Sequence, residues 1–129
     1  MKESDFLGKV YSDGEVIFKE GSEGQVMYII QTGKVSITKQ TSSGEVVVLN
    51  TIGKGDVLGE MSLFDRMPHS ATASAVGDAR ILTVDKRKLF KLISGDPTAV
   101  FKIIQSMSSR IRKLSDELSE YKKTISRLS

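Results

Sequence analysis

The 129-residue sequence has no cysteine, one histidine and two prolines. Without cysteine the chain can form no disulfide, thiolate zinc site or iron–sulfur cluster, and it has no cysteine nucleophile. One histidine cannot build a multi-histidine metal site, so we expect no metal and no resident cofactor.

Long apolar runs are also missing. Residues 46–49 are far too short to cross a bilayer, and residues 1–5 are too polar and acidic for a signal peptide. Hydrophobic residues make up 39% and charged residues 27%, which is typical of a soluble globular protein. Because this length suffices for one domain only, we expect a single cytoplasmic domain with no membrane partner.

Glycine is absent from the last quarter of the chain. All 11 glycines lie at or before Gly95, and both prolines precede residue 98. Helix interiors avoid Gly and Pro whereas turns use them, so residues 1–97 should be turn-rich β structure and residues 98–129 one long helix of the same domain. Turns are expected, among other places, at residues 31–33 and 77–78. Clusters of β-branched and aromatic residues predict strands at residues 9–11, 16–19, 26–32, 35–40, 45–51, 69–76 and 80–85, followed by a short helix at 86–93.

From Ile104 onward, apolar residues recur at spacings of three and four. Such a heptad seam is typical of a coiled coil, and an isolated helix that exposes it is a poor state. The alternative is a helix lying on its own barrel, which we expect for the first turns only. Beyond those turns we predict a homodimer seam formed by Ile111, Leu114, Leu118, Tyr121, Ile125 and Leu128.

The net charge of +3 is carried by the C-terminal part, since residues 98–129 alone hold +4. A basic segment can indicate nucleic acid, but Asp116, Glu117 and Glu120 interrupt this one, which favours a solvated helix face. A helix-turn-helix motif needs two further helices, and no residues follow the heptad pattern. We therefore expect no DNA-binding domain in this chain.

Residues 55–73 carry the most chemistry. Their pattern predicts a strand end, a glycine, a short helical turn and a returning strand. Gly59 lets a ligand approach the backbone, and free amides at the start of a short helix favour anions. Glu60 adds one carboxylate and Ser70 one hydroxyl, which is compatible with a pocket for a phosphorylated sugar.

Several segments together match one known pattern: YSDGEVIFKEG at residues 11–21, YIIQTGKVSI at 28–37, GDVLGEMSL at 55–63, ATA at 71–73, and residues 85–93. They resemble the cyclic nucleotide-binding domain family, found in catabolite activator proteins and kinase regulatory subunits. The resemblance covers roughly residues 9–115. It implies a mainly β fold, an eight-stranded jelly-roll-like barrel followed by a short helix and a long C-terminal helix. It also implies a regulatory module that binds cAMP or cGMP and signals through the long helix to an unknown effector protein.

The resemblance further implies roles for individual residues. Glu60 would accept a hydrogen bond from the ribose 2′-hydroxyl, and Ser115 on the long helix would reach the base. The remaining residues would face the ribose and the cyclic phosphate; they are Gly59, Met61, Ser62, His69, Ser70 and Ala71.

His69 is a departure from the family pattern, which usually has a phosphate-binding arginine in this place. Arginine is permanently charged and binds phosphate through two donors, whereas histidine is mostly neutral at pH 7. Arg66 is an alternative source of charge, although a solvated loop residue is the simpler interpretation. The alternative function is therefore a degenerate, ligand-free dimeric interaction module. If His69 contacts the phosphate, affinity should rise as pH falls through about 6.5.

Catalytic motifs are not evident. Glu60 has no second carboxylate at a useful spacing, and no nucleophile elbow, GK[ST] loop or HExxH pattern occurs. We therefore expect that the chain is not an enzyme.

Overall fold

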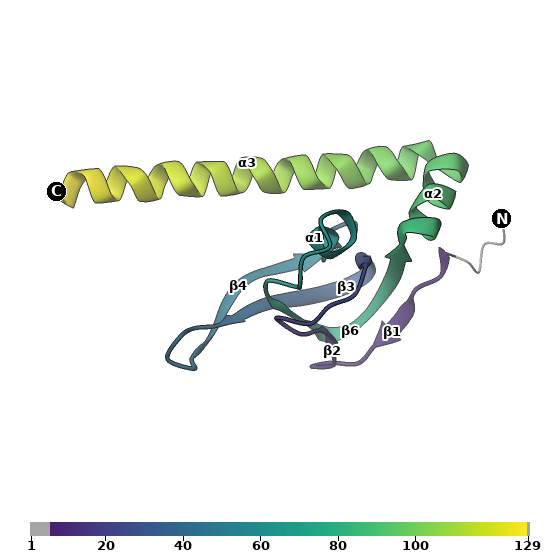
Figure 1. The fold of residues 1–129 in the computed structure, drawn as a ribbon, viewed down its shortest axis with the longest axis horizontal. Helices are drawn as coiled ribbons and strands as arrows, with labels where there is room; N and C mark the ends of the chain where they lie inside the picture. Colours follow the sequence, from purple (N-terminus) through teal and green to yellow (C-terminus); the bar gives the residue numbers. More distant parts are fainter. Residues whose placement is uncertain (1–5, 129) are drawn as a thin grey trace.

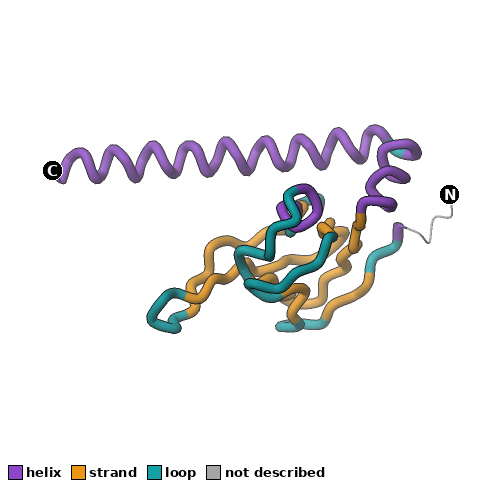
Figure 2. Tube along the Cα trace, viewed as in Figure 1, coloured by secondary structure: helices purple, strands orange, loops and turns teal. Residues whose placement is uncertain are grey.

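The computed structural model describes residues 6–128. The strands form one body that lies on one side of the long helix α3, and α3 runs past the end of that body (Figure 1). Figure 2 shows the same separation between strands and helices. The mainly β class with C-terminal helices is therefore confirmed. In chain order the elements are β1 (Lys9–Tyr11), β2 (Val16–Phe18), β3 (Val26–Gln40), β4 (Val46–Gly53), β5 (Val57–Leu58), α1 (Glu60–Phe64), β6 (Thr72–Asp85), α2 (Lys86–Gly95) and α3 (Pro97–Leu128).

The strands form a single six-stranded sheet. Its order is β1-β6-β3-β4, with β2 paired to β6 and β5 paired to β3, and every pairing is antiparallel. The expected eight strands are thus too many for the described residues, and the two ends of the sheet, β1 and β4, do not pair with each other. The strand end predicted before Gly59 is confirmed as β5, whereas residues 69–71 lie outside β6.

The turns predicted at residues 31–33 and 77–78 are wrong, because both segments lie inside long strands. Gly33 has φ of 88° and Gly77 has φ of 68°, so each glycine bends its strand without ending it. The strands approach closely at this bend: a Cβ on Gly33 would lie 2.5 Å from the carbonyl oxygen of Asp78. The sequence pattern marks both glycines but cannot distinguish a bend from a turn.

The core has two parts, one inside the curved sheet and one between the sheet and the helices. In the first part, the inward positions of β6 include the small residues Ala73 and Ala75. In the second part, Leu92 anchors α2 against Met27 and Val84. Ala73 and Ala75 are buried in this part of the core.

The helix α3 rests on the domain with its first turns only. Val100 and Ile103 pack against the second part of the core, whereas every described residue from Ile111 to Leu128 is exposed. At about 1.5 Å per residue, a helix of this length outruns the small sheet. No helix within residues 6–128 is both long and apolar enough to span a bilayer.

Candidate functional site

The loop from β5 through α1 to β6 encloses a small hollow inside the curve of the sheet, and we call it the loop cavity. Its volume is about 140 Å³. Seven of the eight residues predicted to contact a ligand line it, whereas Ser115 lies exposed on α3 away from it. The full lining comprises Phe18, Ile37, Leu58, Gly59, Glu60, Met61, Ser62, Pro68, His69, Ser70, Ala71 and Arg110. Residues that are distant in sequence are thus gathered around one space, and their ligand contacts stay predictions.

Gly59 shapes the entrance to α1. Its φ is 75°, a left-handed backbone conformation that residues other than glycine rarely adopt. A Cβ here would also lie 3.0 Å from Cε1 of His69 and 3.3 Å from the ring of Tyr28. Glycine therefore allows both the backbone turn and the close approach of the imidazole.

Backbone donors are available beside this glycine. The amide of Ser62 donates to the carbonyl oxygen of Gly59 at 3.1 Å, which makes the first bond of the short helix. The amides of Glu60 and Met61 precede that bond and have no acceptor among the described residues. Together with the hydroxyl of Ser70, they give the cavity wall several uncommitted hydrogen-bond donors.

His69 is part of the cavity wall and is held firmly. Its amide donates to the carbonyl oxygen of Ser22 at 3.0 Å, and its own carbonyl accepts from the amide of Gly21 at 2.7 Å. The imidazole stacks on the ring of Phe18, with 3.9 Å between ring centroids and 19° between planes. The residue is only 6% exposed, and this burial lowers the pKa of His69 from its ordinary value of 6.5. The ring is therefore neutral at pH 7.

The alternative cation proposed for the loop, Arg66, does not line the cavity. It is exposed and has φ of 55°. A solvated loop residue is the interpretation that fits this position.

The positive charge of the cavity instead comes from α3. Nη2 of Arg110 donates to Oε1 of Glu60 at 3.0 Å, and both side chains are largely shielded from solvent, at 28% and 23% exposed. One turn earlier, the hydroxyl of Ser106 donates to Oδ1 of Asp56 at 3.1 Å. The sequence analysis missed Arg110 because it treated the basic residues of the helix as a solvated face, and no local signal links positions 50 residues apart.

A second hollow of about 210 Å³ adjoins the loop cavity, and Arg110 and Ile37 line both. It lies between β4 and α3, and its other lining residues are Leu49, Asn50, Ile52, Lys113, Leu114 and Glu117. Small-molecule pockets are usually larger than about 300 Å³. The loop cavity alone is too small, but the two hollows together offer about 350 Å³. Arg110 thus lines two hollows whose volumes add up to the size of a small-molecule site.

The lowered pKa of His69 predicts a pH-dependent stability. Because the folded state holds the ring neutral, the unfolded chain binds more protons below the ordinary pKa of 6.5. The free energy of unfolding should therefore be fully retained above pH 6.5 and should fall as the pH decreases below it. Urea unfolding at pH 7.5 and 5.5 measures this change. His69→Phe keeps a stacked ring without titration, so an equal loss of stability in that variant would contradict the assignment to His69.

Comparison with known proteins agrees with this geometry. Residues 8–96 match the family model of the cyclic nucleotide-binding domain. The cyclic AMP receptor protein of Thermus thermophilus is 32% identical over 113 residues, which cover 88% of this chain and 52% of the relative. The crystal structure of Thermus thermophilus catabolite activator protein has a TM-score of 0.74 at 31% identity and covers 92% of this chain and 56% of that one.

A third relative was solved with a nucleotide. The cAMP-bound form of the EAL enzyme Bd1971 has a TM-score of 0.60 at 27% identity, covering 92% of this chain and 32% of that one. This chain spans about half the length of the curated relatives that it matches first. On the family match and the shared fold, the chain belongs to the cyclic nucleotide-binding domain family.

Proposed function

We propose that the chain is a regulatory sensor module that binds a cyclic nucleotide in the combined space of the two hollows, with cAMP as the first candidate. The observation that carries the proposal is the convergence of seven predicted ligand residues on one cavity. cAMP is favoured over cGMP because the Thermus relative is named for it and the Bd1971 structure contains it.

The chemistry of the two hollows divides naturally between the parts of such a ligand. The cyclic phosphate fits the loop cavity, where free amides at the start of α1 and the hydroxyl of Ser70 can donate to it. The ribose 2′-hydroxyl can donate to Glu60, because Arg110 occupies only Oε1 and a carboxylate accepts several hydrogen bonds. The base then lies in the second hollow, against Leu49 and Ile52.

Calorimetric titration of the full chain with cAMP and cGMP at pH 7 tests this function. We expect saturable binding of cAMP. His69→Arg should tighten it by about tenfold or more, because a charged donor to phosphate contributes about 1.5–3 kcal/mol. His69→Gln is the matched control, because it loses the stacked ring as His69→Arg does but gains no positive charge.

The outcome that overturns the function is an absence of binding heat with both nucleotides in both the wild type and His69→Arg. That result would favour the second candidate, a dimeric interaction module that keeps the fold without the ligand. The specific observation behind this candidate is the neutral, stacked His69 where a permanent charge is usual in the family.

Arg110 gives the proposed site a link to α3. It contacts Glu60 at one end, and its backbone lies in the helix that leaves the domain. This contact ties α3 to the loop that would hold the phosphate, and the Ser106–Asp56 hydrogen bond ties α3 to the connection just before β5. Since Arg110 lines both hollows, a nucleotide that fills them lies against the Arg110 side chain, which α3 carries. Nucleotide occupancy and helix position are therefore coupled, with Arg110 as a positioning residue.

Arg110→Gln is expected to weaken cAMP binding about fivefold, as for the loss of a partly exposed ion pair that orients Glu60. Arg112→Gln, at an exposed position on the same helix, is the matched control and should leave affinity unchanged. Tighter binding in Arg110→Gln would show that the ion pair blocks the site, and the positioning role would then be wrong.

The output of the module is proposed to be a homodimeric coiled coil that an effector protein recognises. The predicted seam residues are all exposed, from 48% at Ile125 to 83% at Leu128. A continuous apolar stripe on a helix that leaves its own domain is stabilised by burial against a second copy.

We propose no catalytic role, no resident cofactor and no DNA reading for this chain. Among the described residues, no group of three or more His, Asp or Glu side chains is placed to hold a metal.

Sedimentation equilibrium tests the dimer. The wild type should be dimeric at micromolar concentration, and Leu118→Gln should weaken the dimer at least about tenfold, because one leucine is lost from each helix of the seam. Thr124→Gln, an exposed position outside the seam, is the control. A monomeric wild type, or a Leu118→Gln dimer as tight as the control, would rule out this seam.

A further inference from the structure

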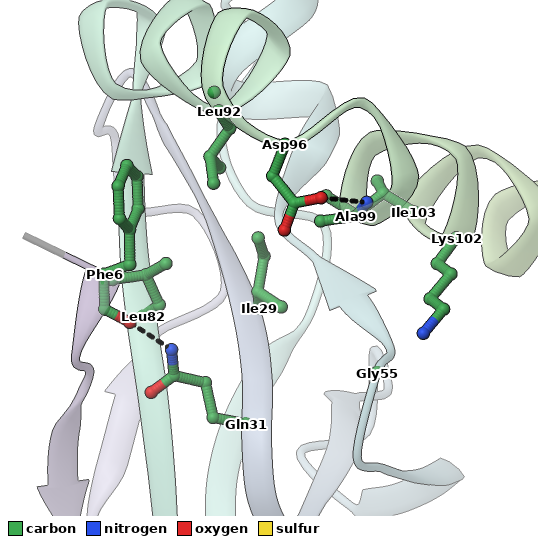
Figure 3. A pocket seen from close by; sticks show the side chains of 11 residues that line it. Phe6, Ile29, Gln31, Gly55, Leu82, Leu92, Asp96, Ala99, Lys102 and Ile103 are labelled. Atoms are coloured by element: carbon green, nitrogen blue, oxygen red, sulfur yellow. Dashed lines mark hydrogen bonds between the residues drawn. The ribbon is translucent and has the colours of Figure 1, made fainter. Parts of the chain in front are cut away.

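The largest hollow that α3 helps to enclose lies elsewhere, under the corner where α2 meets α3, and we call it the corner cavity. Its volume is about 520 Å³, within the usual range for small-molecule sites. Figure 3 shows Phe6 and Leu82 at one side, Leu92 above, and Ala99 and Ile103 from α3. The corner cavity shares no residue with the loop cavity or the second hollow.

Most of the polar groups at the corner cavity already have partners. The side-chain amide of Gln31 donates to the carbonyl oxygen of Phe6 and accepts from the amide of Gly8 at 2.7 Å. Oδ1 of Asp96 accepts from the amide of Ala99 at 3.0 Å, which caps the start of α3 (Figure 3). Lys102 is different, because its ammonium group makes no hydrogen bond or ion pair with the described residues.

Positive charge is concentrated in the corner formed by α2 and the start of α3, and it favours an anion. Residues 86–103, which form the corner, carry five cationic side chains and one acidic side chain, a net +4, whereas residues 1–85 carry a net −4. The single acid among residues 86–103 is Asp96, whose Oδ1 already accepts the hydrogen bond that caps α3. Of these cations Lys102 lines the corner cavity, and a positive charge at the edge of an apolar cavity attracts ligands of opposite sign.

We propose that the corner cavity binds a small amphipathic acid, such as a medium-chain fatty acid. The apolar chain lies between the sheet and the first turns of α3, against Ile29, Leu92 and Ile103. The carboxylate lies at the rim and accepts a hydrogen bond from Lys102. Because Ala99 and Ile103 precede Ser106 and Arg110 on the same helix, an occupant of this cavity bears on the part of α3 that contacts the loop.

Amide NMR of the full chain, titrated with decanoate below its micelle concentration, tests the proposal. We expect saturable shifts at the amides of Ala99 and Ile103, with decanol binding more weakly than decanoate. Ala99→Leu fills the cavity with a residue that favours helix and should weaken decanoate binding about tenfold or more. Lys102→Gln should weaken decanoate about threefold and leave decanol unchanged, as for one exposed charge pair.

Lys122→Gln, on the exposed distal half of α3, is the matched control and should bind decanoate like the wild type. The proposal is overturned if decanoate gives no saturable shift, or if Ala99→Leu binds it as well as the wild type. Equal binding of decanol and decanoate, with no effect of Lys102→Gln, overturns the assignment of an acid. Because cAMP binding is measured separately, failure here is distinguishable from failure of the sensor function.

Discussion

The pairing of β3 with β6 is the constraint on which the rest of the structure depends. Every other strand joins the sheet through one of these two: β1 and β2 pair with β6, and β4 and β5 pair with β3. The two strands stay paired through a bend at which a Cβ on Gly33 would lie 2.8 Å from Cα of Ala79. This bend curves the sheet, and the loop cavity lies beside the loop that precedes β6.

The loop cavity depends on that curvature and on two side-chain contacts, one from β2 and one from α3. Phe18 of β2 stacks on the ring of His69, and His69 in turn packs against Gly59. This wall of the cavity is therefore formed by stacked neutral rings and not by a charged side chain. Arg110 closes the opposite side through Glu60. A neutral wall with one cation supplied by α3 brings the helix to the cavity, and this is the physical basis of the proposed coupling between ligand and helix.

The first turns of α3 lie between two different environments. Ala99, Lys102 and Ile103 face the apolar corner cavity, whereas Ser106 and Arg110 make polar contacts with the loop around the proposed nucleotide site. Beyond Arg110 the helix leaves the domain and every described residue is exposed. One short stretch of helix, residues 99–110, thus lies at both cavities and precedes the exposed stripe predicted as a dimer seam.

The sequence by itself determined the fold class, the start of the long helix and seven of the residues around the loop cavity, because glycine placement, β-branched clusters and the family motif are local signals. It did not determine the strand count, since Gly33 and Gly77 bend paired strands only because a neighbouring strand continues the hydrogen bonds. Only the tertiary structure decided that Arg110, and not Arg66, supplies the charge, because burial and the distance to Glu60 depend on where α3 crosses the loop. It also decided that His69 is neutral and stacked, since its pKa follows from the burial that the assembled sheet imposes.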